Sequence, residues 1–150
     1  MCHHLISLKK AGCFDFEVGL VNGTKAPKKT RARIFRELGL DDEGDDVKIS
    51  RESRINALET CARHDVVLLR DTDGSIRAGK IELHIDVGGD ALSLLYPWKL
   101  VRKVGGTYMY TWEIGDAAEY WKTCDILIAV IYTMFPDGSA GILMPSGFRF

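Results

Sequence analysis

The sequence predicts an α+β fold, in which a largely antiparallel β-sheet carries two or three α-helices packed on one face. Three observations predict it. Segments with an apolar period of two outnumber those with helical spacing, tight turns such as Asn22-Gly23 join most of the strands, and helices and strands are largely segregated along the chain. With 150 residues, the chain has the length of a single domain, residues 1–150, which can bury a core without disulfide or metal staples.

The first third of the chain predicts one strand, one helix and one loop. Residues 13–21 alternate between apolar and polar side chains, as a half-buried strand does. Residues 25–38 have Pro27 near their start and Gly39 just past their end, which is the usual punctuation of a short helix. The acidic residues 41–46 that follow predict a solvated loop.

Two further helices are expected. Ser50 can cap the free amides of a first helical turn, and the residues after it have helical spacing in their apolar side chains. These side chains are Ile55, Leu58 and Ala62. Asp116 followed by Glu119 is a capping pattern for a third helix, with Tyr120, Trp121 and Cys124 on it.

Six strands are expected after residue 65, where the apolar period changes from 3.6 to 2. They are residues 66–70, 76–87, 92–101, 108–114, 126–135 and 141–144. The apolar phase of the second slips by one at Gly79-Lys80, which predicts a β-bulge there. A four-residue loop after this strand sets Ile81, Leu83 and Ile85 opposite Trp98, Tyr96 and Leu94.

Composition and charge are those of a soluble globular protein. Apolar residues make up 46% and charged residues 27%, and the net charge of −1 predicts no general attraction to nucleic acid or to an anionic membrane. The longest uncharged apolar run, residues 126–135, is about half as long as a membrane span. The cysteines are Cys2, Cys13, Cys61 and Cys124, with no C-x-x-C pair. Since this scatter suits free thiols in a reducing compartment, we expect a cytoplasmic protein.

A basic stretch coincides with the first predicted helix. Its cations are Lys25, Lys28, Lys29, Arg31, Arg33 and Arg36, the type of residue that contacts phosphates. The acidic residues 41–46 follow immediately and can neutralise these cations within one hairpin. Nucleic acid is therefore not an expected partner.

The segment I-E-L-H-I-D-V, residues 81–87, has the clearest alternation in the chain. As a regular strand it places Glu82, His84 and Asp86 in a row on one face, with neighbours roughly 6–7 Å apart. A carboxylate, an imidazole and a carboxylate in a row could bind a divalent metal or act as a general acid and base. They could equally form the solvated face of a half-buried sheet.

Aromatic residues crowd into the region that follows this strand. Besides Tyr120 and Trp121, they are Tyr96, Trp98, Tyr108, Tyr110 and Trp112, more than one core of this size easily hides. Most could be core residues, but Tyr and Trp are also the preferred residues of ligand pockets and subunit interfaces. The favoured function is therefore that of a non-enzymatic protein without a cofactor, which binds a small-molecule ligand or forms a homo-oligomer through this aromatic-rich sheet.

The order of the predicted elements from Ser50 onward resembles the core of the PD-(D/E)XK nucleases: helix, several strands, helix, strand. The segments W-K-T-C-D-I-L-I-A-V-I-Y, P-D-G-S and G-I-L-M-P are similar to the final strands of some of these enzymes. The resemblance implies an alternative function, a nuclease-like enzyme that uses Mg²⁺ held by Asp65 and Glu82. His84 stands at the position where the family has its lysine.

Overall fold

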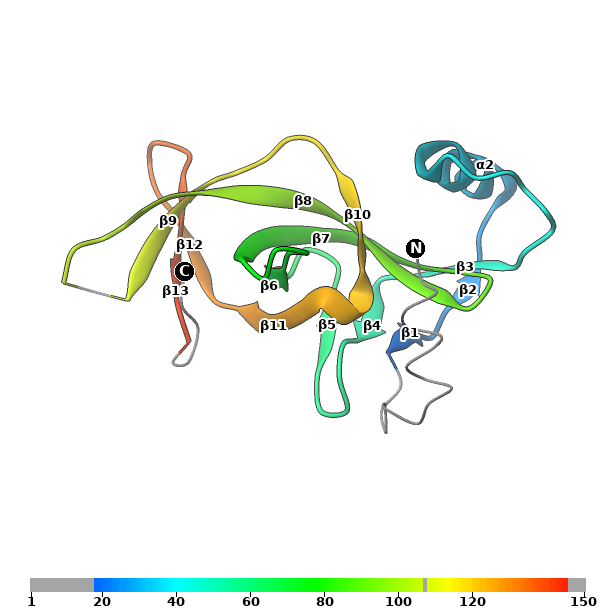
Figure 1. The fold of residues 1–150 in the computed structure, drawn as a ribbon, viewed down its shortest axis with the longest axis horizontal. Coiled ribbons are helices and arrows are strands. Elements are labelled where there is room, and N and C mark those ends of the chain that lie inside the picture. Colours follow the sequence, from blue (N-terminus) through cyan, green and yellow to red (C-terminus); the bar gives the residue numbers. More distant parts are fainter. Residues whose placement is uncertain (1–17, 107, 146–150) are drawn as a thin grey trace.

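The computed structural model describes residues 18–106 and 108–145 (Figure 1). It is mostly β-sheet, with 53% of residues in strands and 11% in helices, so the expectation of an α+β fold with two or three helices is wrong. In the described part of the chain, α2 (Lys28–Leu38) is the one α-helix, and η1 (Thr123–Asp125) is a single 3-10 turn. No helix there is long and apolar enough to cross a membrane.

The strands of the described residues form two antiparallel sheets. They are β1 (Gly19–Val21), β2 (Thr24–Lys25), β3 (Val47–Ser50), β4 (Glu52–Arg54), β5 (Thr60–Ala62), β6 (Val66–Arg70), β7 (Ile76–Val87), β8 (Asp90–Lys103), β9 (Met109–Glu113), β10 (Glu119–Lys122), β11 (Ile126–Val130), β12 (Tyr132–Met134) and β13 (Ala140–Leu143). The smaller sheet has the order β1-β4-β5. The larger one is built on the long β7–β8 hairpin, to which β3, β6, β9 and β10 pair.

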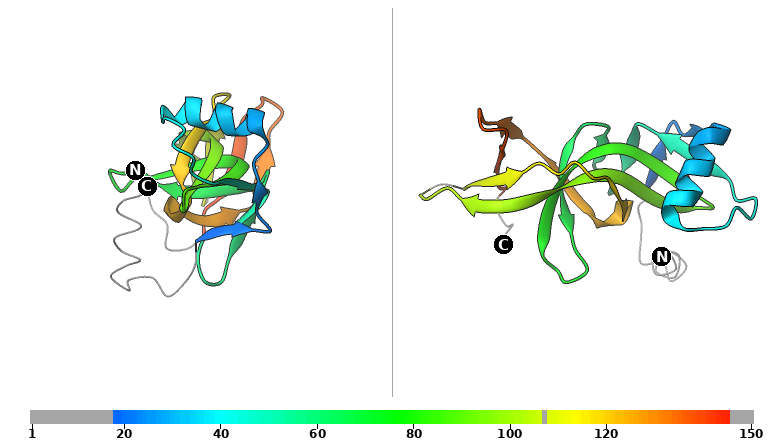
Figure 2. Two further views of the ribbon diagram at one scale, coloured as in Figure 1. Left: turned by 90° about the vertical axis from the view of Figure 1, so that its right-hand side faces the viewer. Right: turned by 90° about the horizontal axis from the view of Figure 1, so that it is seen from above.

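The larger sheet curls round a buried core (Figures 1 and 2). Its main path runs β11-β6-β7-β8-β9-β13-β12, and Ile131 alone separates its first strand from its last along the chain. Both ends of the path therefore belong to one nearly continuous segment. Leu68, Trp98, Trp112 and Ile142, which come from four different strands, are packed in one cluster inside this curl.

Helix α2 confirms the first predicted helix and lies at one end of the elongated molecule (Figure 2). Its apolar face buries Ile34 and Phe35 against Val47 of β3 and Ile85 of β7. Gly39 ends the helix with a φ of 68°, a left-handed conformation that glycine adopts without steric cost. Of the strand expected over residues 13–21, only its end is described, as β1, and residues 13–17 lie outside the described residues.

The helix predicted from Ser50 is wrong, because this segment forms the β4–β5 hairpin. Its turn is held by Asn56, whose Oδ1 accepts hydrogen bonds from the backbone N–H groups of Leu58 and Glu59 at 2.8 and 2.9 Å. Leu58 lies at the tip of the turn and is 94% exposed, whereas Ile55 and Cys61 pack against the large sheet. The helical spacing of the apolar residues was therefore not the spacing of one buried face.

The helix predicted from Asp116 is also wrong, because residues 119–122 form β10, paired with β8. Tyr120 and Trp121 contact different clusters: Tyr120 packs against the core beneath α2, and Trp121 packs against the core beside β4 and β5. Successive side chains of a strand point to opposite faces, so both aromatic rings are packed only if this segment is extended.

The β7–β8 hairpin differs from the predicted one in turn, bulge and register. Gly88 and Gly89 form a two-residue turn with φ of 60° and 96°, the positive values that such tight turns require. Ile81 lies opposite Leu95 and Leu83 opposite Leu94, so the bulge is at Glu82 and not at Gly79-Lys80. Gly79 has a different role, since a Cβ there would lie 2.8 Å from Cδ1 of Leu95.

Candidate functional site

The bulge at Glu82 breaks up the expected row of polar side chains. Residues 82 and 84 were expected on one face of a regular strand, but the extra residue changes the phase of the side chains after it. His84 is fully buried, with 0% of its surface exposed. Glu82 is partly exposed and forms an ion pair with Arg63 at 2.7 Å. The two side chains therefore lie in different surroundings.

His84 is the centre of a buried polar chain that joins four elements. Its Nδ1 lies 2.7 Å from Oγ of Ser93 on β8, and that hydroxyl lies 2.8 Å from Oγ1 of Thr123 on η1. Its Nε2 lies 3.5 Å from Sγ of Cys61 on β5. None of the four side chains is more than 1% exposed. We call these four residues the His84 chain.

Burial keeps the His84 chain uncharged at neutral pH. Desolvation lowers the pKa of His84 to about 4, although a hydrogen bond at Cys61 and the charge of Asp65 act in the opposite direction. Desolvation also raises the pKa of the Cys61 thiol to about 12, and the charges of Asp65 and Glu52 add to this effect. A thiolate–imidazolium pair, the form in which cysteine acts as a nucleophile beside histidine, is therefore disfavoured here.

The residues of the nuclease-like alternative each have a local partner. Asp65 accepts a hydrogen bond at 2.8 Å from the backbone N–H of Ala62, which closes the turn before β6. Glu82 pairs with Arg63, and His84 belongs to the buried chain. In the part of the chain that the structure describes, no group of three or more His, Cys, Asp or Glu side chains could hold a metal ion.

The five aromatic residues expected to form a ligand site or an interface are divided between core and surface. Trp98 and Trp112 are each 1% exposed and belong to the core. Tyr96 and Tyr110 are half-buried, and Tyr108, just before β9, is 74% exposed. The structure does not bring these five side chains together in one cavity.

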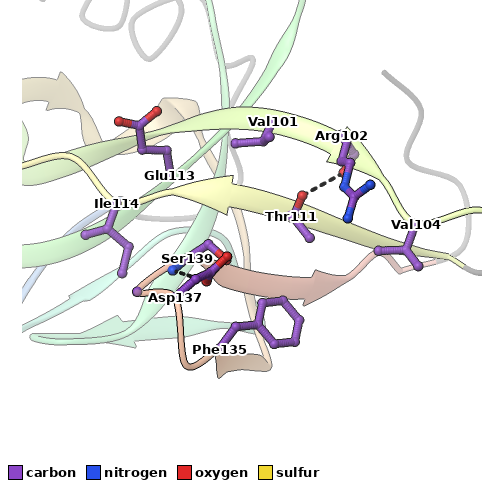
Figure 3. Close-up of a pocket in the computed structure, with 10 residues that line it drawn as sticks. Val101, Arg102, Val104, Thr111, Glu113, Ile114, Phe135, Asp137 and Ser139 are labelled. Atoms are coloured by element: carbon purple, nitrogen blue, oxygen red, sulfur yellow. Dashed lines mark hydrogen bonds between the residues drawn. The ribbon is translucent and has the colours of Figure 1, made fainter.

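A separate concavity of about 660 Å³ lies on the outer face of this part of the sheet, which we call the arm groove (Figure 3). It is bounded by the end of β8, by β9 and by the turn between β12 and β13. Its lining residues are Val101, Arg102, Val104, Thr111, Glu113, Ile114, Phe135, Asp137, Gly138 and Ser139.

One wall of the arm groove exists because residue 141 is a glycine. Phe135 folds back over β13, and a Cβ at Gly141 would lie 2.7 Å from Cζ of its ring and 2.9 Å from Sδ of Met109. The turn after Phe135 is fixed by Asp137, whose Oδ1 accepts hydrogen bonds from the backbone N–H and the hydroxyl of Ser139 at 2.9 and 2.6 Å. These bonds lower the pKa of Asp137 below its usual value.

The arm groove combines apolar walls with three charged side chains, Arg102, Glu113 and Asp137. Val101 and Ile114 are 57% and 38% exposed, so the groove has uncovered apolar surface. Arg102 lies at one end and Glu113 with Ile114 at the other (Figure 3). Arg102 forms no ion pair with any described residue. Such a site can bind an amphipathic molecule and fix its orientation.

Sequence reasoning missed this groove, because its residues come from three separate segments. The pairing of Leu143 with Met109 and of Gly141 with Thr111 brings the turn after β12 against β9. One signal was available, namely the turn sequence P-D-G-S between an apolar run and a glycine. That signal predicts a hairpin, but not which strand the hairpin pairs with.

Comparisons with known proteins give no match: no protein-family model, no curated protein and no solved structure is similar to this chain. A functional argument therefore has to come from the molecule itself. The nuclease-like alternative stays a prediction that depends on the sequence pattern alone.

Proposed function

We propose that this protein is a non-enzymatic binding module, whose arm groove takes a small, mostly apolar molecule with an anionic group. The observation that carries the proposal is the meeting of exposed apolar side chains with Arg102, a cation that has no carboxylate partner among the described residues. The volume of about 660 Å³ lies within the usual range for ligand pockets.

Charge at the two ends of the groove selects the orientation of the ligand. An anionic group near Arg102 gains a charge-assisted hydrogen bond, whereas the same group near Glu113 meets a like charge. The apolar part of the ligand then lies along Ile114 and Phe135, where it covers surface that is otherwise in contact with water. The groove therefore favours one direction of binding for a molecule with a single acidic head.

The chemistry of the lining residues supports binding rather than catalysis. The ten residues that line the groove include neither histidine nor cysteine, the commonest general base and the strongest side-chain nucleophile. Oδ1 of Asp137 accepts two hydrogen bonds from Ser139, which hold the turn. The titratable pair of Cys61 and His84 is buried elsewhere in the molecule, as part of the His84 chain.

The proposal is tested with anilinonaphthalene sulfonate, an apolar fluorescent probe with one anionic group. We expect saturable binding by the wild-type protein, and a dissociation constant about tenfold higher for Arg102→Gln, which loses a charge-assisted hydrogen bond but keeps the stem of the side chain. Arg70→Gln is the matched control, because Arg70 is exposed on β6 and does not line the groove.

Two results would contradict the groove as the binding site. One is unchanged binding of the probe by Arg102→Gln. The other is an equal loss of binding in both arginine variants, which indicates attraction by net charge alone. Urea unfolding of each variant has to be measured alongside, since this probe also binds partly folded chains.

A further inference from the structure

Strand β12 has an open edge. It is the last strand on the main path of the large sheet and pairs only with β13 in the described part of the chain (Figure 1). No described residue pairs with its other side, where the N–H and C=O groups can pair with a further strand. Ile131, Tyr132 and Met134 along this edge are 87%, 37% and 50% exposed, so large apolar side chains accompany the open backbone.

This edge lacks the charges and prolines by which many proteins protect exposed strands, and its shortness, at three residues for β12, is the one such feature it has. Residues 131–135 include no charged side chain and no proline, and the ten residues 126–135 are uncharged throughout. The strands β8-β9-β13-β12 have β8 on the side away from β12, and β8 is different. Its residues 99–103 include Lys99, Arg102 and Lys103, and it has a bulge at Val101. Charges and bulges of this kind discourage pairing between molecules.

We infer that β12 pairs antiparallel with β12 of a second copy of this chain, about a two-fold axis at Thr133. Such pairing is self-complementary, because large apolar residues oppose one another on both sides of the central Thr133 pair. It sets Tyr132 opposite the partner's Met134, and Ile131 opposite the partner's Phe135. No like charges meet, since this segment carries none. The large sheets of two copies then form one continuous sheet, independently of any ligand in the arm groove.

The first test is a charged residue on the edge. Wild-type protein is expected to show twice the chain mass of 16.8 kDa in sedimentation velocity at high concentration. Met134→Lys is expected to raise the dimer dissociation constant by about tenfold or more, since it places a cation beside the partner's apolar side chain. Leu58→Lys is the matched control: Leu58 is 94% exposed on the β4–β5 turn, far along the chain from β12.

The inference is overturned if the wild-type protein is a monomer at all concentrations. It is also overturned if both lysine variants weaken the dimer equally, which indicates general hydrophobic association. A monomeric protein that captures an added foreign β-strand peptide on β12 is a third overturning result, because it shows that the edge serves a different partner.

A crosslink tests the register of the pairing. Thr133→Cys places two thiols opposite each other across the two-fold axis, and we expect a disulfide-linked dimer under mild oxidation. Leu58→Cys and the wild-type protein supply the background from the other cysteines. If Thr133→Cys gives no more linked dimer than Leu58→Cys, the two-fold axis is not at Thr133 and the proposed pairing is wrong.

Discussion

His84 and Ser93 lie directly opposite each other on the β7–β8 hairpin, and Nδ1 of the imidazole is 2.7 Å from the serine hydroxyl. The two residues face each other only in the register that the Glu82 bulge and the Gly88-Gly89 turn create. A slip of one residue would leave the imidazole in an apolar interior without this partner. Because a buried polar group without a hydrogen bond is costly, the pair favours this register over its neighbours.

Stability should depend on pH through His84. Its folded-state pKa of about 4 lies below the ordinary value of 6.5, so the unfolded chain binds the proton more readily than the folded one. The resulting stabilisation is fully present above pH 6.5 and is lost as the pH falls toward 4. The slope inside this window is about 1.4 kcal/mol per pH unit, and the total is about 3 kcal/mol.

Urea unfolding between pH 7 and pH 4 measures this loss. His64→Gln is the control, because His64 is exposed in the turn before β6 and lies outside the His84 chain. Asp42, Asp73 and Asp137 have lowered pKa values, so their contributions are lost at lower pH and do not overlap with the upper part of the window. A flat stability curve between pH 6.5 and 5 contradicts the assignment to His84.

Removing the Ser93 hydroxyl should lower the free energy of unfolding by more than the small size of this group suggests. In Ser93→Ala, Nδ1 of His84 and the hydroxyl of Thr123 lose a shared partner in a region closed to water. We expect the free energy of unfolding to fall by about 1–3 kcal/mol. Thr60→Ala, at an exposed position of β5, should change it by less than about 0.5 kcal/mol. Equal effects of the two substitutions would show that the His84 chain contributes nothing to stability.

Cys61 should be protected from alkylation as long as the protein is folded. Its thiol is 1% exposed and its pKa is raised to about 12, so little thiolate forms and reagents cannot reach it. We expect iodoacetamide to modify Cys61 at least about a hundredfold more slowly than Cys124, which is only partly buried. Peptide mapping by mass spectrometry separates the two sites, and similar rates in the folded protein would be inconsistent with the buried hydrogen bond to His84.

The sequence allowed prediction of those elements whose signals are local. Pro27 and Gly39 bracket α2 in both prediction and structure, and β6 and β7 have the predicted bounds of residues 66–70 and 76–87. These features depend on backbone conformations that one residue type favours, or on a run of apolar residues that any neighbouring strand can cover.

Features that depend on a distant partner could not be predicted. The bulge at Glu82 leaves no trace in the sequence. Ile81 and Leu83 on either side of it are both apolar, so residues 81–87 still alternate between apolar and polar side chains. His84 is then buried beside Cys61 and Ser93, which contact it from two other elements, and Thr123 contacts Ser93 from a third. The arm groove likewise depends on the pairing of β13 with β9, which no short pattern specifies.

The contact between Gly141 and Phe135 gives a direct test of how the groove wall is built. In Gly141→Ala, the new methyl group comes within 2.7 Å of the Phe135 ring, so the ring or the strand has to move. We expect a loss of about 1–3 kcal/mol in the free energy of unfolding, as for other overpacked sites. Gly105→Ala is the matched control, because a Cβ there meets no atom within 4 Å.

Rescue tests whether the loss of stability comes from this steric contact with the Phe135 ring. Replacing the ring by a smaller side chain, in Gly141→Ala combined with Phe135→Leu, should restore part of the loss, since the two residues touch and their effects are not additive. The double variant should also bind anilinonaphthalene sulfonate differently from the wild-type protein, because Phe135 lines the arm groove. Strictly additive losses in the double variant would mean that the ring does not lie over Gly141 in solution.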